Sequence, residues 1–281
     1  MSPADALREG SGAQPEPPPL RMPGVGDSRI LDELHRLALE QPRLDLLQFR
    51  SLPGAHQYRP LYRLCRRYLR SGASVLDWGA GNGHFSYFLL RAGYRARGFT
   101  IAEVACLDWV RDLGLEVVLG DPRDPVGIPL ADGSVDGVVS VGVLEHVRET
   151  GGDEAASLRE IARVLRPGGT FLCYHLPNRY SWIEALSGLV PGKHHHEFRF
   201  TRRDIEALLE SAGLAPLEIG RYGFLPRNLG HRLPAALRGL APLADAWDAL
   251  DTALAFPFSA VCQNYHIVAR KAGGGLSHVA G

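Results

Sequence analysis

The sequence lacks an excess of either charge, since 31 Lys and Arg residues balance 31 Asp and Glu residues in a chain of 281. A dedicated nucleic-acid binder usually carries a basic excess, so we expect no nucleic-acid partner. Cysteine is scarce as well, and no two of the four cysteines form a C-x-x-C pair. This usage argues against a zinc cluster or a disulfide framework and is typical of reduced, buried thiols in a cytoplasmic protein.

Long apolar runs are also absent. The first residues contain Asp5, Glu9 and a Pro/Gly run where an export signal needs an apolar stretch. The longest uncharged stretch, 252–269, includes several polar residues, so we expect a helix end and then a strand there, not a membrane span. Residues 1–27 have almost no apolar periodicity, which predicts a disordered leader, and the Gly-rich residues 272–281 predict a flexible tail.

The rest of the chain has the composition of a globular protein, with 45% hydrophobic and 22% charged residues overall. Apolar residues recur at helical spacing over 30–38 and 58–69, which predicts two helices. From residue 74 onward, short apolar runs alternate with helical segments, the pattern of an α/β fold with a doubly wound sheet. The expected strands are Ser74–Trp78, Ala96–Ile101, Leu115–Leu119, Val135–Val141, Thr170–Leu176, Ala215–Tyr222 and Ala260–Ala269.

A glycine-rich turn follows the first expected strand. Asp77 comes just before it, and Gly79, Gly81 and Gly83 give the spacing G-x-G-x-G ahead of a helix. Glycine lets a backbone approach a ligand closely, and a helix N-terminus offers free N–H groups. A dinucleotide fingerprint would need Gly or Ala where His84 stands, and an acid at position 77 would repel a pyrophosphate. The turn therefore favours a cationic or amino-bearing ligand, with a purely structural turn as the alternative.

The segments that follow this turn occur in the order of a known family. They are Gly120-Asp121, Leu130–Asp136, Val143–Val147 and Leu165–Thr170. With residues 77–83 they resemble the motifs of class I S-adenosylmethionine-dependent methyltransferases, in particular the branch of ubiquinone-biosynthesis O-methyltransferases and natural-product methyltransferases. The resemblance implies a Rossmann-like, doubly wound sheet of seven strands with one antiparallel strand near the edge. It also implies one domain, 28–271, with N-terminal helices and a helical cap insertion.

The resemblance further implies a binding site for S-adenosylmethionine. Asp77 and the backbone of the glycine turn would hold the methionyl end, and Asp121 would accept from the adenine amino group. Thr100 stands where an acid usually binds the ribose hydroxyls, with Glu103 in the next turn as an alternative. The residues implied to bind the cofactor are Asp77, Gly79, Ala80, Gly81, Thr100, Ile101, Asp121, Pro122 and Val141. Ordinary strand packing is the other reading of positions 100, 101 and 141.

The implied reaction is transfer of a methyl group to a small-molecule acceptor by in-line displacement at the sulfonium carbon. An oxygen nucleophile often needs a base, and histidine has a suitable pKa, which favours oxygen as the acceptor atom. We expect His146 and His196 to be catalytic, with His175 as a further candidate. Glu145 and His146 match two positions of metal-assisted relatives, but Gly142 stands where a further acid is usual, so we expect no required metal.

Two segments outside the sheet are candidates for covering the site. Helix 58–70 bears five arginines and is either a solvated basic face or a lid that binds an anionic substrate group. Residues 223–259 carry an apolar stripe broken by prolines, which predicts a helical cap over the substrate. The alternatives for this insertion are a packing subdomain and a weak peripheral membrane contact without stable insertion. The oligomeric state is left open.

Three other functions fit parts of the sequence. The first is a binding or scaffold protein that keeps the methyltransferase fold but does not catalyse methyl transfer. A nicotinamide-dependent oxidoreductase would use Glu103 as its ribose acid, but the misplaced third glycine disfavours it. Methylation of RNA or protein is disfavoured because the sequence has no Asn-Pro-Pro-Tyr type signature and no added nucleic-acid module.

Overall fold

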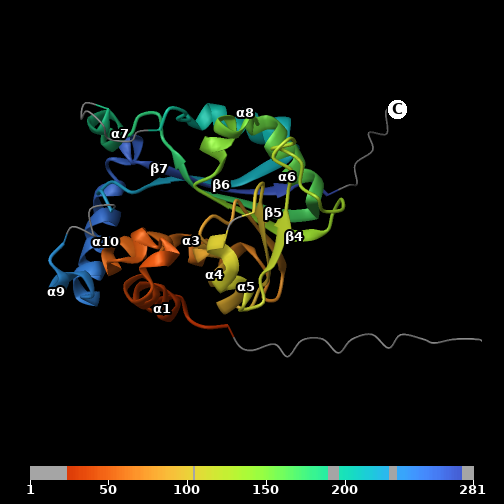
Figure 1. Ribbon diagram of the computed structural model, residues 1–281. Coiled ribbons are helices and arrows are strands. Elements are labelled where there is room, and N and C mark those ends of the chain that lie inside the picture. Colours follow the sequence, from red (N-terminus) through yellow and green to blue (C-terminus); the bar gives the residue numbers. More distant parts are fainter. Residues whose placement is uncertain (1–23, 104, 189–195, 228–232, 274–281) are drawn as a thin grey trace, which may run out of the picture.

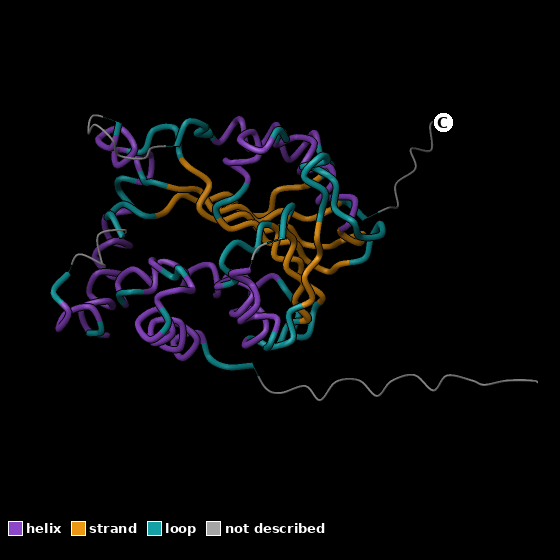
Figure 2. The backbone as a smooth tube through the Cα atoms, viewed as in Figure 1, coloured by secondary structure: helices purple, strands orange, loops and turns teal. Residues whose placement is uncertain are grey.

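The computed structural model describes residues 24–103, 105–188, 196–227 and 233–273, which build one seven-stranded sheet with helices on both faces (Figures 1 and 2). The strand order is β3-β2-β1-β4-β5-β7-β6. Neighbours from β3 to β5 are parallel, whereas β7 runs antiparallel to both β5 and β6. The expected doubly wound sheet with one antiparallel strand next to the edge is therefore confirmed. The strands are β1 (Ser74–Trp78), β2 (Arg95–Thr100), β3 (Glu116–Leu119), β4 (Val135–Val141), β5 (Leu165–Pro177), β6 (Leu214–Tyr222) and β7 (Asn264–Lys271).

The strands alternate side chains between two hydrophobic cores. Val75 of β1 packs into the core beneath α1, α3 and α4, while the next residue, Leu76, packs into the core beneath α6 and α8. Figure 1 shows these two groups of helices on opposite faces of the sheet. Both faces are thus covered, as a parallel sheet requires. The α-helices are α1 (Asp27–Glu40), α2 (Leu52–Ala55), α3 (Arg59–Tyr68), α4 (His84–Arg91), α5 (Asp108–Arg111), α6 (Glu154–Val164), α7 (Trp182–Ser187), α8 (Arg202–Ser211), α9 (Ala235–Arg238) and α10 (Ala241–Ala255).

Local chemistry explains where several elements begin. Thr201 and Asp204 form a capping box that starts α8, and the Asp153 side chain caps α6 through the amide of Ala156. The last strand begins four residues later than the sequence pattern predicts. The reason is that the Asn178 side chain donates to the carbonyls of Ala260 and Cys262, which takes the groups that a strand would use for its ladder.

The two ends of the chain and the cysteines were both subjects of sequence predictions. Most of the predicted leader and tail, residues 1–23 and 274–281, lies outside the described residues. Residue 25 already contacts the domain, because the Val25 amide donates to the carbonyl of Arg91. All four cysteines are free thiols, and three of them are buried. Within the described part of the chain, no helix is both long and apolar enough to cross a membrane.

Candidate functional site

A cavity of about 420 Å³ lies at the carboxyl ends of β1, β2 and β4. The strand order reverses between β1 and β4, and open α/β sheets bind ligands at such a switch point. The volume is within the ~300–1,000 Å³ of small-molecule sites. We call this space the glycine-turn cavity, because the turn between β1 and α4 forms one of its walls.

The glycine turn is shaped by close packing on its neighbours. Gly79 has φ +84°, and a Cβ at that position would lie 2.5 Å from a methyl carbon of Val143. The amides of Gly79 and Ala80 both donate to the carbonyl of Phe99, at 3.1 and 2.9 Å. These two N–H groups therefore hold the turn against β2, so they are not the free ligand donors that the sequence led us to expect.

Asp77 is a buried acidic residue that lines the glycine-turn cavity. It is 1% exposed, and one of its carboxylate oxygens accepts a hydrogen bond from the Ser86 hydroxyl at 2.6 Å. Burial raises the pKa of Asp77 to about 7, and the bond from Ser86 only partly offsets this rise. A buried carboxyl whose pKa is close to 7 is only partly ionised at neutral pH. A cationic ligand group in the cavity would favour its fully ionised form.

Seven of the nine residues expected to bind a cofactor line this cavity. They are Asp77, Gly79, Ala80, Gly81, Thr100, Ile101 and Val141. The Thr100 hydroxyl, however, donates to the carbonyl of Ala102 at 2.8 Å, so it is already engaged in a local turn. Glu103 is exposed and does not line the cavity.

Asp121 and Pro122 are not among the residues that line the glycine-turn cavity. Asp121 accepts a hydrogen bond from the amide of Arg123, and its backbone pairs with Asp124. Pro125, three residues further on, lines the cavity instead.

A second space of about 370 Å³ adjoins the glycine-turn cavity, and the two share His84, Val141, Gly142 and His146 as lining residues. We call it the histidine chamber, because four imidazoles line it. Both expected catalytic residues, His146 and His196, belong to this set. The structure adds residues that sequence reasoning did not assign to a site or left as secondary candidates: Gln48, Gln57, Tyr58, His84, Glu145, His175, Tyr222, Gly223, Leu225 and Arg227.

Three buried polar atoms of the histidine chamber have no hydrogen-bond partner among the residues that the structure describes: Nε2 of His84, Nε2 of His175 and Oε2 of Glu145. Burial lowers the pKa of His84 to about 4 and that of His175 to about 3, and it raises the pKa of Glu145 to about 7. Both imidazoles are therefore neutral at physiological pH. Unsatisfied buried polar atoms are rare in proteins, so their convergence on one chamber indicates a place for a polar ligand.

His175 has an unusual backbone. Its φ is +67°, in a region that residues with side chains seldom occupy, and the ladder between β5 and β7 shifts register around it. The Tyr222 hydroxyl oxygen accepts from the His175 amide and lies 2.9 Å from Nδ1, which leaves Nε2 for the chamber. No sequence pattern marks this position, because the strain arises from a bulge that only the paired strands define.

His196 and His146 each have a carboxylate on Nδ1. The His196 ring lies 3.2 Å from Glu184, whose other oxygen accepts from the His196 amide at 3.1 Å. This hydrogen bond to Glu184 raises the pKa of His196, and it outweighs the burial that favours the neutral ring. His146 lies 2.7 Å from Glu149, and the centroids of the two imidazoles are 5.6 Å apart. An imidazole supported in this way is a competent proton acceptor.

Among the described residues, two clusters have the residue types of a metal site. In the first, one ligand atom each from Glu145, His146 and His196 lies within 4.8 Å of the others, so these residues could hold a divalent cation in the histidine chamber. The second consists of His56, Asp245 and Asp248. In that cluster the Arg59 guanidinium lies 2.9 and 3.2 Å from the two aspartates and already supplies the positive charge.

The chain before α3 covers the histidine chamber, which Gln48, Gln57 and Tyr58 line. The Asn82 side chain, in the glycine turn, donates to the carbonyl of Asp45 at 2.9 Å. The rings of Phe49, Tyr58 and His84 pack together with centroids 4.8 to 5.4 Å apart. The cover is thus formed by the turns up to Tyr58 and less by α3, whose buried residues pack into the core beneath the sheet.

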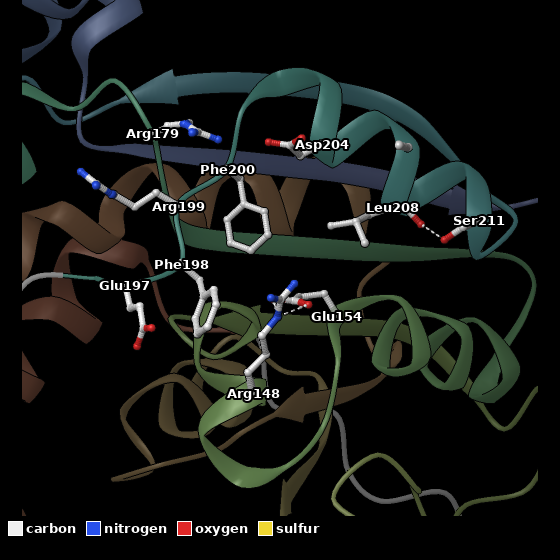
Figure 3. Close-up of a pocket in the computed structure, with 11 residues that line it drawn as sticks. Arg148, Glu154, Arg179, Glu197, Phe198, Arg199, Phe200, Asp204, Leu208 and Ser211 are labelled. Carbon is white, nitrogen blue, oxygen red and sulfur yellow. Dashed lines mark hydrogen bonds and ion pairs between the residues drawn. The ribbon is translucent and has the colours of Figure 1, made fainter.

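A further cleft lies between α8 and the 3₁₀ turn Leu144–Thr150, as Figure 3 shows. Arg148 pairs there with the buried Glu154 at 2.9 Å and stacks on Phe198, with 4.5 Å from its guanidinium carbon to the ring centroid. The cleft shares no lining residue with the glycine-turn cavity or the histidine chamber. It therefore stands apart from the residues expected to carry the chemistry.

Comparison with known proteins agrees with the motifs and the fold. Residues 76–173 match the family model described as Methyltransferase domain. The chain is 34% identical over 184 residues to Methyltransferase GfsG of Streptomyces halstedii, covering 61% of this chain and 63% of that protein. It is 29% identical over 194 residues to the ubiquinone biosynthesis O-methyltransferase of Ralstonia nicotianae, covering 61% of this chain and 79% of that one.

Solved structures support the fold. Phosphoethanolamine N-methyltransferase 2 of Haemonchus contortus, solved in complex with S-adenosyl-L-methionine, aligns with a TM-score of 0.51 at 16% identity, covering 77% of this chain and 53% of that one. The chain spans less than two thirds of the length of GfsG. The fold, the glycine turn with Asp77 and the matched segment agree with one another: residues 76–173 match a methyltransferase domain, and the chain is similar to S-adenosylmethionine-dependent methyltransferases.

Proposed function

We propose that this protein transfers the methyl group of S-adenosylmethionine to an oxygen atom of a small-molecule acceptor. The observation that carries the proposal is the contact between two spaces, one holding Asp77 and the glycine turn, the other lined by histidines. They meet at Val141, Gly142, His84 and His146, where a methyl group would pass from one to the other. Residues 28–271 would act as one domain in this reaction.

The cofactor roles follow from the lining of the glycine-turn cavity. Asp77 would pair with the ammonium group of the methionyl end, and the backbone at Gly81 would lie against it. Ile101 and Pro125 would provide an apolar wall for the adenine ring. The sulfonium carries a positive charge that makes its methyl carbon electrophilic, so the protein's main task is alignment.

The acceptor would lie in the histidine chamber. His196, held by Glu184, would take the proton of the acceptor hydroxyl as its oxygen attacks the methyl carbon, and the carbon–sulfur bond would break to leave neutral S-adenosylhomocysteine. The neutral rings of His84 and His175 would place the acceptor through their unpartnered Nε2 atoms. A chamber of about 370 Å³ suits a small molecule better than a polymer chain.

The cofactor assignment predicts a selective thermal shift. S-adenosylhomocysteine at about 100 times its dissociation constant should stabilise the fold by ~2.7 kcal/mol, which raises the melting temperature by several degrees. The same concentration of NAD should leave the melting temperature unchanged. A shift with NAD and none with S-adenosylhomocysteine would support an oxidoreductase instead.

Metal removal should have little effect on the reaction. His196, whose Nδ1 lies 3.2 Å from Glu184, can accept the acceptor's proton without a Lewis acid. We expect EDTA treatment to change the rate of tritiated methyl transfer to a panel of phenols and carboxylic acids by less than about twofold. Loss of transfer that Mg²⁺ or Zn²⁺ restores would assign Glu145, His146 and His196 as metal ligands.

A further inference from the structure

His84 stands where a dinucleotide fingerprint would need glycine or alanine. It lines both the glycine-turn cavity and the histidine chamber, so it lies where the two spaces meet. Its ring packs against Phe49 and Tyr58, with ring centroids 5.4 and 4.8 Å away. This packing holds the imidazole in one orientation, so each ring nitrogen has a defined set of neighbours.

Asn82 determines which ring nitrogen of His84 carries the proton. Its side-chain amide donates to the carbonyl of Asp45 at 2.9 Å, and its Oδ1 lies 2.7 Å from Nδ1 of His84. The same Oδ1 accepts from the backbone amide of His84 at 3.4 Å. An amide oxygen can only accept, so Nδ1 must donate and therefore carries the proton. The opposite orientation of Asn82 would place its oxygen against the Asp45 carbonyl, with two acceptors facing each other.

The second ring nitrogen of His84, Nε2, is therefore a lone pair and not a donor. It is buried and has no hydrogen-bond partner among the described residues. Burial lowers the pKa of His84 to about 4, so Nε2 stays unprotonated at physiological pH. A buried acceptor without a partner is costly, so a ligand that donates to Nε2 makes the contact that the protein itself leaves open.

His175, in the same chamber, has the opposite polarity. The Tyr222 hydroxyl oxygen accepts from the His175 amide and lies 2.9 Å from Nδ1 of the ring. The hydroxyl hydrogen is then donated to Nδ1, which leaves the ring proton on Nε2. Both imidazoles pack on Tyr58, with ring centroids 4.8 and 5.3 Å from that ring. Their neighbours thus make one imidazole an acceptor and the other a donor.

We propose that Asn82 is a positioning residue that keeps Nε2 of His84 as a hydrogen-bond acceptor, so that the histidine chamber selects molecules with an O–H or N–H group facing it. The proposal rests on the proposed function, since it takes the chamber as the place of the molecule to be methylated. A ring of such low basicity does not remove the proton it is offered. The group that meets His84 is therefore a second polar group of that molecule, distinct from the hydroxyl that His196 deprotonates. An ether or ketone oxygen at this place would face the lone pair and be rejected.

Nitrogen NMR of the isotope-labelled, full-length protein tests the protonation of His84 directly. Its ring signals are assigned from their loss in His84→Phe. At neutral pH, Nδ1 should have the chemical shift of a protonated nitrogen and Nε2 that of an unprotonated one. Asn82→Ala should move the proton to Nε2 in a large part of the molecules. Asn82→Asp keeps an oxygen that accepts from Nδ1 and should keep Nδ1 protonated.

Tyr222→Phe is the matched control, because it removes the hydroxyl beside His175 and leaves Asn82 in place. It should change the ring signals of His175 and leave those of His84 unchanged. The melting temperature of each variant shows whether the fold is retained. A change at His84 in Tyr222→Phe as large as that in Asn82→Ala would mean that Asn82 has no specific part in setting the tautomer.

Two related probes test the selection that follows from this polarity. Phenol can donate through its hydroxyl, whereas anisole, its methyl ether, cannot. Phenol at millimolar concentrations should move the Nε2 signal of His84 saturably, and anisole should bind at least about tenfold more weakly. The preference for phenol should be lost in Asn82→Ala and kept in Tyr222→Phe.

Three results would overturn the proposal: a proton on Nε2 of His84 in the wild-type protein, unchanged His84 signals in Asn82→Ala, or no preference for phenol over anisole. The proposed function is tested separately by binding of S-adenosylhomocysteine and by methyl transfer. If the wild-type protein does neither while its His84 signals are as expected, the proposed function fails and the part that Asn82 plays in fixing the tautomer stands.

Discussion

Asp77→Ala should lower the affinity for S-adenosylhomocysteine by at least about 100-fold. The wild-type carboxylate is buried and would pair with the ligand's ammonium group, and breaking a buried charge pair costs ~3–5 kcal/mol. The variant would leave the ammonium group in a cavity without a counter-charge. Isothermal titration calorimetry measures the loss directly.

Asp77→Asn is the control that separates charge from packing. The amide keeps the volume of the side chain and a hydrogen-bond acceptor for the Ser86 hydroxyl, so the fold should be retained. Its affinity should fall nearly as far as that of the alanine variant, because both lack the negative charge. Wild-type affinity in both variants, with an unchanged melting temperature, would refute the cofactor assignment.

The same carboxyl should make binding depend on pH. Burial raises the pKa of Asp77 to about 7, so the free protein is increasingly protonated below that pH, whereas the bound ammonium requires the carboxylate. Binding must then release a proton, and affinity should fall by up to about tenfold per pH unit below pH 7. In Asp77→Asn this slope should be absent.

The sequence predicted the structural features that depend on residues close together in the chain. The alternation of apolar runs and helices predicted strands β1 to β4 nearly to the residue. The motif around Asp77 located the glycine turn between the first strand and the helix that follows it. These features are encoded by neighbouring residues, so a single chain is sufficient to recognise them.

The sequence did not predict features that depend on contacts between distant segments of the chain. The strained backbone of His175 depends on the pairing of β5 with β7 and on a hydroxyl 47 residues away. Arg59 and Arg63 look alike on the expected helix, yet two aspartates of α10 pair with Arg59, whereas no described carboxylate lies at ion-pair distance from Arg63.

The base that takes the acceptor proton gives the second large expected effect. His196→Ala should lower the turnover number by about 10²-fold or more, since general-base catalysis contributes ~10²–10⁴. Affinity for S-adenosylhomocysteine should stay unchanged, because His196 lines the histidine chamber and not the glycine-turn cavity. The measurement is tritiated methyl transfer to an acceptor found in the panel of phenols and carboxylic acids.

The pH profile distinguishes a base from a residue that only shapes the chamber. In the wild-type protein, turnover should rise as His196 loses its proton, and the bond to Glu184 raises its pKa, so the rise should be centred above the ordinary histidine value of ~6.5. Glu184→Gln keeps the hydrogen-bonding shape but removes the charge, and it should move the rise to lower pH. His146→Ala leaves the pair of His196 and Glu184 intact and should retain this rise, although its turnover number falls if His146 assists the transfer. If His196→Ala and His146→Ala both keep wild-type turnover at every pH, proton transfer to histidine is not part of the mechanism, and the acceptor must enter the reaction already ionised.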